Sequence, residues 1–133
     1  MDQSFARARY TVMVVEDDPG IGAMLKTMLQ EHFKLRAVVA TGGLTAVVMA
    51  NETRPDLILA DLHLPYISGF EVIRCIKDDP ALHDIPIIAF SNHDWDFNWE
   101  KRALDAGCIK CSHKVVSVEE LGEIIGEVLD LKS

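Results

Sequence analysis

The sequence predicts an α/β fold in which one doubly wound, five-stranded parallel sheet is covered by helices on both faces. Strand-like apolar runs alternate with helix-like patterns, in which apolar residues lie three and four apart, along nearly the whole chain. There is no linker, repeat or low-complexity segment. Apolar residues make up 49% of the 133 positions, which is enough to fill the core of a single domain.

The first half of the chain is expected to hold three strands and two helices. Residues 10–15 form a buried strand, and Pro19 then opens a helix, because proline suits the first helical turn. Asp18 is expected to cap that helix. Its apolar positions are 21, 24, 25, 28 and 29. Residues 35–40 are the second strand and 44–52 the second helix, which Arg54-Pro55 ends. Residues 56–60 are the third strand.

The second half continues the alternation. Residues 69–77 are predicted to be helical, and two prolines at 80 and 86 frame the loop before a fourth strand at 85–90. A more polar helix over 96–106 ends at Gly107, a typical C-cap. A short fifth strand at 109–113 precedes the last helix, 118–129, which carries one apolar face.

Acidic residues stand where the first and third predicted strands end. Glu16-Asp17-Asp18 follows the first apolar run, and Asp61 follows Leu57-Ile58-Leu59-Ala60. In open parallel sheets, ligands bind beyond the carboxyl ends of the strands, at the point where the strand order reverses. The order 2-1-3-4-5 makes these two strands neighbours at that point. Carboxylates gathered there repel one another, and a hard divalent cation with oxygen ligands, Mg²⁺ above all, would offset the repulsion.

Composition excludes several classes of function. The formal net charge of −8 disfavours direct nucleic-acid binding, which calls for a basic face. No apolar stretch approaches the ~20 residues of a membrane span, and residues 1–9 lack the apolar region of a secretory signal. The expectation is therefore a cytoplasmic single domain over residues 1–133, with 1–9 as a flexible lead.

The chain resembles the receiver domain of two-component response regulators, which has a flavodoxin-like fold. The resemblance rests on Glu16-Asp17-Asp18-Pro19, on Asp61-Leu-His-Leu-Pro65 with Gly69, on Ile87-Ile88-Ala89-Phe90-Ser91, and on Lys114 after Gly107. Each motif is weak alone, but their order, spacing and placement at strand ends are specific.

The resemblance implies a role for each of these residues. Asp61 would accept a phosphoryl group from a histidine of a kinase or phosphotransfer protein, and would release it slowly by self-hydrolysis. Mg²⁺ would be held by Asp17 and Asp61, by Glu16 through water, and by the backbone carbonyl of His63. Ser91 would donate a hydrogen bond to the phosphoryl oxygens, and Lys114 would pair with the phosphate. His63 and His93 occupy positions that tend to tune how long the phosphate persists, although two exposed loop histidines are an equally good interpretation.

Three departures from the family pattern fall on the face that usually carries the signal. Cys111 stands where an aromatic residue is usual, and Val115 stands where a proline usually follows Lys114. A cis bond before a non-proline residue costs ~3–4 kcal/mol, so a trans bond or a rebuilt loop is expected there. The segment from Ser91 to Lys114 is also one residue longer than the common family pattern. The hypothesis is a domain that accepts phosphate and signals by a non-standard rearrangement around residues 95–99.

Two further clusters admit two interpretations each. Trp95, Phe97 and Trp99 could form a partner surface with Cys111 and Val115, or could cover the core. Cys108 and Cys111 resemble a redox or metal motif, but strand alternation is expected to point them to opposite faces, which argues against such a role.

The alternatives differ in class. A receiver-like module could bind proteins without ever carrying phosphate, a domain using Cys108 and Cys111 could sense redox state, and a Mg²⁺-dependent phosphotransferase would need a substrate pocket. The preferred prediction is a signalling switch rather than an enzyme acting on separate substrates. Its expected contacts are a kinase or phosphotransfer protein, an unnamed downstream target, and a second copy through the face between the fourth and fifth helices.

Overall fold

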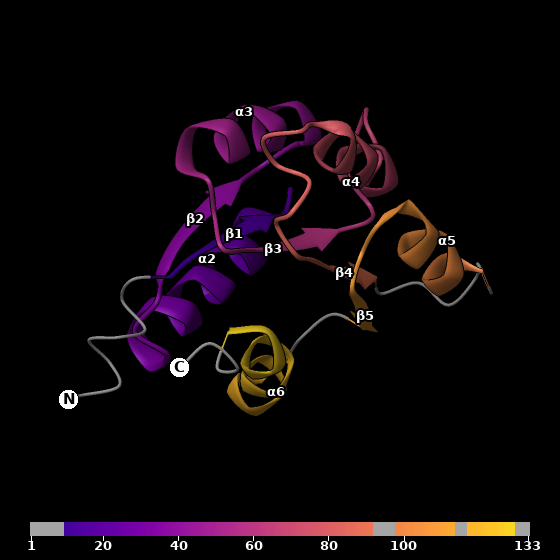
Figure 1. Ribbon diagram of the computed structural model, residues 1–133. Coiled ribbons are helices and arrows are strands. Elements are labelled where there is room, and N and C mark those ends of the chain that lie inside the picture. Colours follow the sequence, from indigo (N-terminus) through magenta and orange to yellow (C-terminus); the bar gives the residue numbers. More distant parts are fainter. Residues whose placement is uncertain (1–9, 92–97, 114–116, 130–133) are drawn as a thin grey trace.

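The computed structural model describes residues 10–91, 98–113 and 117–129. Five parallel strands form one sheet in the order β2-β1-β3-β4-β5, with helices on both faces (Figure 1). The strands are β1 (Thr11–Val15), β2 (Arg36–Ala40), β3 (Leu57–Asp61), β4 (Ile87–Ser91) and β5 (Lys110–His113). The predicted α/β class, strand number and strand order are confirmed.

The helices follow the predicted places closely. They are α2 (Pro19–Thr27), the π-helical turn η1 (Met28–His32), α3 (Gly43–Thr53), α4 (Gly69–Asp78), α5 (Trp99–Ala106) and α6 (Val118–Leu129). The sequence predicted one continuous pattern through Leu29, but the last turn of this segment widens into η1. The predicted 96–106 helix begins at Trp99, after Asn98 as its cap residue.

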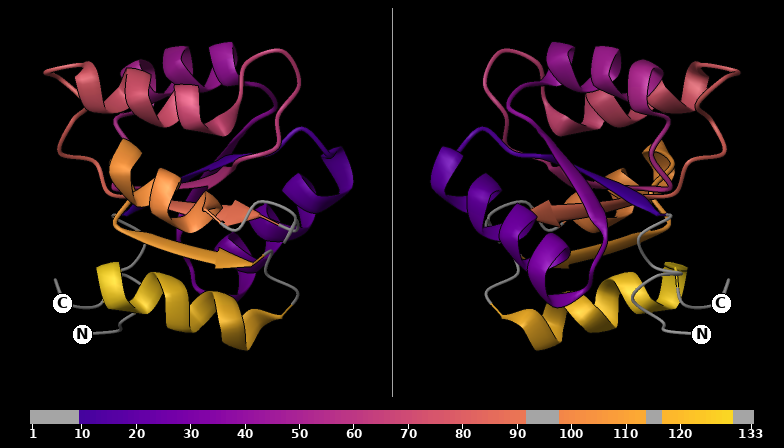
Figure 2. Two further views of the ribbon diagram at one scale, coloured as in Figure 1. Left: turned by 90° about the vertical axis from the view of Figure 1, so that its right-hand side faces the viewer. Right: turned by 90° about the vertical axis from the view of Figure 1, so that its left-hand side faces the viewer.

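The sheet divides the core into two layers, one on each face. Figure 2 shows α3, α4 and α5 on one side of the sheet and α2 and α6 on the other. Met13 and Val15 of β1 face the first layer, and Val12 and Val14 face the second. Every described residue of β3 and β4 is buried, as expected for the central strands of a parallel sheet. The rigid middle of the sheet therefore ends at Asp61 and Ser91.

Local sequence signals fix the ends of the helices. Asp18 Oδ1 accepts hydrogen bonds from the backbone N–H groups of Gly20 (2.8 Å) and Ile21 (3.1 Å), so the predicted N-cap is confirmed. Arg54 is in the left-handed region (φ 49°) and ends α3 before Pro55. Gly107 ends α5 at φ +124°, a conformation that side chains rarely adopt.

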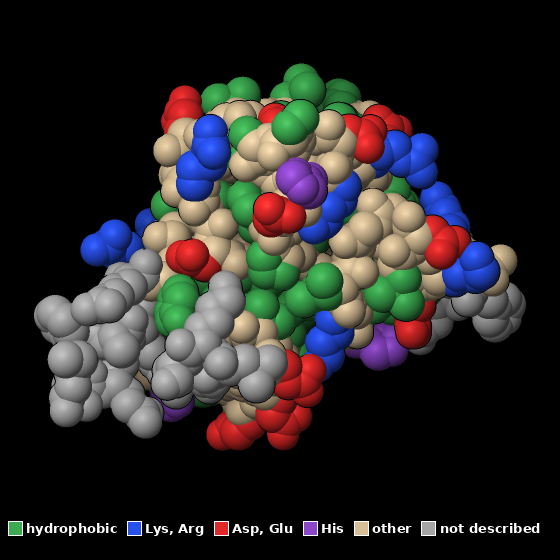
Figure 3. All heavy atoms as spheres, viewed as in Figure 1, with side chains coloured by type: hydrophobic (Ala, Val, Ile, Leu, Met, Phe, Trp, Pro, Cys, Tyr) green, Lys and Arg blue, Asp and Glu red, His purple; other side chains and the backbone are tan. Residues whose placement is uncertain are grey.

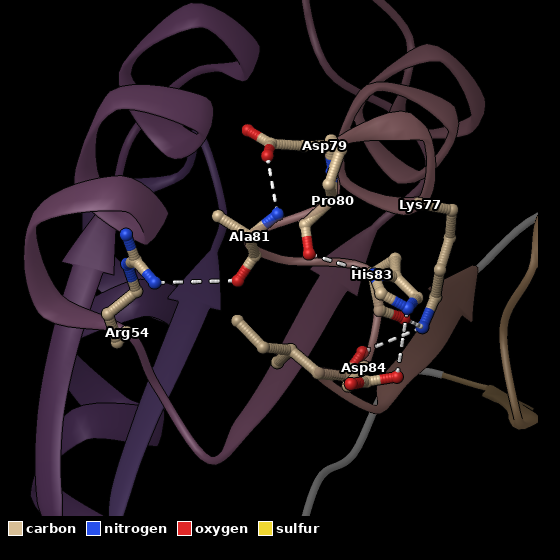
Figure 4. A network of polar contacts seen from close by, with 8 residues as sticks. Arg54, Lys77, Asp79, Pro80, Ala81, His83 and Asp84 are labelled. Atoms are coloured by element: carbon tan, nitrogen blue, oxygen red, sulfur yellow. Dashed lines mark hydrogen bonds and ion pairs between the residues drawn. The ribbon is translucent and has the colours of Figure 1, made fainter.

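The loop between α4 and β4 lies at the end of the sheet opposite the acidic residues. Lys77 Nζ donates to the backbone carbonyls of His83 (3.0 Å) and Ile85 (2.8 Å) (Figure 4). Desolvation lowers the pKa of Lys77 from its ordinary value. Arg54 reaches the Ala81 carbonyl of the same loop from the end of α3 (Figure 4). These contacts tie α3, α4 and the loop together far from the acidic site.

No helix in the described part of the chain is both long and apolar enough to cross a membrane.

Candidate functional site

Three carboxylates meet at the carboxyl edge of the sheet. Glu16 and Asp17 follow β1, and Asp61 ends the neighbouring strand β3, with Val15 of β1 paired to Ala60 of β3. One oxygen of each carboxylate lies within 4.8 Å of the others. Glu16 and Asp61 are buried, at 3% and 5% exposure, whereas Asp17 is exposed. The cluster is thus anchored in the fold but open to solvent on one side.

The backbone around Glu16 is held by both neighbouring elements. Its N–H donates to the Ala40 carbonyl at the end of β2 (3.0 Å), and its side-chain Oε1 accepts from the Asp18 N–H (3.2 Å). Because Asp18 caps α2, the three neighbouring acids have two different roles. Glu16 and Asp17 point to the site, and Asp18 starts the helix.

Asp61 is oriented by the loop that follows it. Its Oδ1 accepts a hydrogen bond from the His63 backbone N–H at 2.9 Å. The Leu62 N–H bonds to the Phe90 carbonyl (3.0 Å), which continues the pairing of β3 with β4 past the strand end. The carboxylate is therefore fixed by backbone groups on a rigid strand end, where a reacting group needs to be held.

Ser91 ends β4 beside Asp61 and is fully buried. Its Oγ lies 2.9 Å from the His63 imidazole Nε2, which is a hydrogen bond in either direction according to the tautomer. The sequence motifs pointed to Ser91 and to His63 separately, but not to this contact. A side-chain contact between a loop and the end of a distant strand leaves no periodic signal in a sequence, so the pairing becomes visible only in three dimensions.

A small hollow lies beneath the cluster. Its walls are apolar side chains of β1, α2, β3 and β4, and Glu16 and Asp61 contribute the polar atoms. Low-polarity walls strengthen the electrostatic interaction of the carboxylates with any cation or anion bound above them.

Comparison with known proteins agrees with this arrangement. The family model described as the response regulator receiver domain matches residues 12–126. The chain belongs to this family. It is a receiver domain of two-component signalling, and receiver domains are signalling switches that carry the phosphoryl group on an aspartate.

Relatives and solved structures cover almost the same length of chain. The polar-differentiation response regulator DivK of Brucella anthropi is 37% identical over 119 residues, which is 90% of this chain and 95% of the relative. The chemotaxis response regulator CheY4 of Vibrio cholerae superposes with a TM-score of 0.82 at 22% identity, covering 90% of this chain and 98% of that one. This second likeness shows the fold alone.

A third relative was solved with a metal ion. It is the receiver domain of a sensor histidine kinase from Pseudomonas aeruginosa, with a magnesium ion coordinated in its active-site cleft. The TM-score is 0.81 at 26% identity, over 91% of this chain and 98% of that one.

Several predicted site residues lie outside the described residues. These are Lys114 and Val115, after β5, and His93, Trp95 and Phe97, between β4 and α5. Their expected roles, and the expected geometry of the bond between Lys114 and Val115, stay predictions.

Trp99 is described, and it is not part of an exposed surface. It is 6% exposed and belongs to the core layer on the α3, α4 and α5 side of the sheet. Its ring lies edge-on to that of His113, with 6.1 Å between the two centroids. Of the two interpretations of the aromatic cluster, the core interpretation holds for Trp99, and its expected place on a partner surface is wrong. A large aromatic side chain at the start of a short helix covers the edge of the sheet.

The expectation that Cys108 and Cys111 face opposite sides of the sheet is also wrong. Both pack against the same core layer, because β5 starts only at Lys110 and strand alternation does not extend back to Cys108. Burial raises the pKa of Cys108 to about 12 and that of Cys111 to about 11. Thiols that stay protonated at neutral pH are poor nucleophiles and metal ligands, so the burial that raises both pKa values still disfavours a redox or zinc site.

Cys111 is half-buried and packs on the core layer from the edge strand β5. Its Sγ approaches the Glu100 carbonyl of α5 at 3.6 Å, and its register neighbour on β4 is Ala89.

Proposed function

We propose that this receiver domain takes a phosphoryl group from a phosphohistidine of a kinase or phosphotransfer protein onto Asp61, in a Mg²⁺-dependent reaction. The observation that carries the proposal is the cluster of Glu16, Asp17 and Asp61, whose oxygens lie within 4.8 Å of one another. Three carboxylates held this close on two strand ends repel one another. A hard divalent cation with oxygen ligands fits them.

The residues present suit Mg²⁺ in particular. Asp17 and Asp61 would be direct ligands, Glu16 would act through water, and the His63 backbone carbonyl would complete the protein's share. Mg²⁺ prefers few protein ligands and keeps several waters, which agrees with one exposed carboxylate and an open side. When bound, the ion neutralises charge that builds up between the carboxylates and the incoming phosphate.

The transfer itself is a displacement at phosphorus. A carboxylate oxygen of Asp61 forms the new O–P bond while the P–N bond of the phosphohistidine breaks, and the imidazole leaves with the electron pair. Such transfer depends on in-line positioning and charge neutralisation more than on covalent help. The backbone N–H of His63 orients the nucleophile at 2.9 Å, and Ser91 would donate to a phosphoryl oxygen.

The chain then acts through protein contacts. The phosphorylated aspartate adds charge and acceptor oxygens at the carboxyl edge of the sheet. Its own slow hydrolysis would reset the switch, because an acyl phosphate is readily attacked by water. Cytoplasmic location and a homodimer through the face of α5 and α6 belong to the same proposal.

The test is intact-mass analysis after incubation with acetyl phosphate, with Mg²⁺ or with a chelator. The wild-type protein should gain one phosphoryl group only with Mg²⁺, and Asp17→Asn should need much more Mg²⁺ for the same gain. Asp105→Asn is the matched control, since it changes an exposed carboxylate on α5 that pairs with Lys101. Equal gain with and without chelator would contradict the metal dependence. The absence of any gain would support a receiver that binds proteins without carrying phosphate.

A further inference from the structure

His63 makes two contacts that join the acceptor aspartate to the buried serine. Its backbone N–H donates to Asp61 Oδ1, and its imidazole Nε2 bonds with Ser91 Oγ, both at 2.9 Å. Because Ser91 is fully buried at the end of a central strand, its hydroxyl bonds with the groups that meet at that strand end. The imidazole is one of these groups, and it belongs to the loop between β3 and α4.

A phosphoryl group on Asp61 changes what the Ser91 hydroxyl can do. A serine hydroxyl has one proton to donate and turns about its Cβ–Oγ bond to suit its partners. When that proton goes to a phosphoryl oxygen, an imidazole that had accepted it must find another donor. An imidazole that had donated a proton to Oγ must also move, because the lone pairs of Oγ turn together with the hydroxyl proton. In both tautomers the position of the His63 ring depends on the state of Ser91.

The loop that carries His63 is packed tightly against the start of α3. A Cβ atom placed on Gly43 would lie only 2.0 Å from Ile67 Cγ2 and 2.9 Å from Val72 Cγ2. Ile67 stands four residues after His63, and its N–H bonds back to the Pro65 carbonyl (2.8 Å). A shift of His63 would therefore move Ile67, whose side chain is in close contact with Gly43 at the start of α3.

This loop also reaches the surface. Tyr66 is fully exposed and sits in the left-handed region at φ 69°, a conformation uncommon for an aromatic residue. Leu44 and Val48, one turn apart on α3, are exposed as well, and hydrophobic side chains gather along the upper edge of the molecule, where α3 lies (Figure 3). A change in the loop would alter this exposed surface of the loop and α3, to which a partner protein can bind.

On β5 the register neighbour of Ser91 is His113, and Cys111 lies two residues before it. Cys111 is a small side chain aligned with Ala89, two residues before Ser91 on β4, and its sulfur is held near the Glu100 carbonyl.

We propose that His63 relays the state of Ser91 to the loop between β3 and α4, so that residues 64–67 and the first turn of α3 change when Asp61 is phosphorylated. This inference rests on the proposed function. In this relay, the state of Ser91 acts on the loop through the His63 imidazole.

The experiment compares backbone amide spectra by NMR, before and after treatment with acetyl phosphate and Mg²⁺. The variants are wild type, His63→Ala, His63→Gln and Cys111→Ala, and the phosphorylated fraction of each sample is measured by intact mass. Shifts are compared between the phosphorylated forms. In the wild type, the amides of Leu64, Ile67 and Gly43 should shift. These shifts should be lost in His63→Ala and should return at least in part in His63→Gln, whose amide can still bond with Ser91. Cys111→Ala should keep them.

Three results would overturn the relay. Undiminished shifts of Leu64, Ile67 and Gly43 in phosphorylated His63→Ala would show that another route moves the loop. Failure of both His63 variants to gain a phosphoryl group would place the His63 side chain in the transfer itself. A wild-type protein that gains no phosphoryl group would overturn the proposed function, and the relay with it, and the mass measurement separates this outcome from the first.

Discussion

Gly69 packs directly on the backbone of Asp61. A Cβ atom at position 69 would lie 2.5 Å from the Asp61 carbonyl oxygen and 2.5 Å from the Leu62 Cα, distances that real Cβ atoms essentially never show. The first turn of α4 thus sits against the strand end that presents the acceptor carboxylate. The glycine in the motif of this family has a steric reason here, which is the close approach of two backbones.

Replacing Gly69 with alanine should therefore disturb both stability and the site. Because the clash is with backbone atoms that cannot swing away, we expect a loss of about 1–3 kcal/mol in the free energy of unfolding, the usual cost of overpacking. Urea denaturation followed by circular dichroism measures it. Gly42→Ala is the control, since a Cβ there meets nothing within 4 Å and the backbone is extended (φ −160°). Equal effects of the two substitutions would contradict the steric explanation.

The two neighbouring aspartates of the first acidic run should separate into a structural and a metal-binding residue. Asp18→Ala removes the cap of α2 and should lower the free energy of unfolding by about 1 kcal/mol, with little change in Mg²⁺ affinity. Asp17→Asn should weaken Mg²⁺ binding and leave the free energy of unfolding nearly unchanged, because its exposed side chain caps nothing in α2. Urea denaturation and calorimetric Mg²⁺ titration of both variants check this. Weakened Mg²⁺ binding in Asp18→Ala equal to that in Asp17→Asn would contradict the division.

Lys77 should stabilise the loop between α4 and β4 through its two hydrogen bonds to backbone carbonyls (Figure 4). Lys77→Met keeps the aliphatic stem and removes the ammonium group, so the loss should be about 1–2 kcal/mol from the missing charged donor. Lys101→Met is the control, an exposed lysine on α5 that pairs with Asp105 and should matter little. Thermal unfolding of the two variants at neutral pH distinguishes them, and equal melting temperatures would argue against the loop contacts.

The buried thiols should make the fold less stable in alkali. In the folded chain, burial raises the pKa of Cys108 to about 12, above the ordinary value of 9.0, so the unfolded chain loses this proton first. This contribution to stability is complete below pH ~9 and is lost as the pH rises from there towards the raised pKa of Cys108. Urea denaturation at pH ~7 and pH ~10 should show a smaller alkaline loss in Cys108→Ala than in the wild type. Cys75→Ala, which changes an exposed thiol, should keep the wild-type loss. An unchanged loss in Cys108→Ala would contradict the account.

Much of the fold could be predicted because its signals are local. Apolar runs, Pro19, Arg54-Pro55 and Gly107 mark the elements, and parallel strands then bring the acids of β1 and β3 to one edge. The place of the site then followed from the strand order 2-1-3-4-5, which makes these two strands neighbours at the point where the order reverses.

What the sequence missed depends on contacts between distant segments or on an exact strand boundary. The face that Cys108 occupies changes because β5 starts at Lys110, one residue later than the apolar pattern suggests. Burial of Trp99 depends on how a short helix packs on the sheet. The π-helical turn η1 keeps Leu29 in the core although the spacing of apolar residues there suits an ordinary helix. The bond between His63 and Ser91 joins residues 28 positions apart.

The most direct test of the central claim is to map the phosphoryl group to its residue. Wild-type protein and Asp61→Asn would be treated with acetyl phosphate and Mg²⁺, reduced with borohydride, which converts an aspartyl phosphate to homoserine, and then digested and analysed by tandem mass spectrometry. We expect homoserine at position 61 of the wild type and no phosphoryl gain in Asp61→Asn. A phosphoryl group on another residue, or an equal gain in Asp61→Asn, would contradict it.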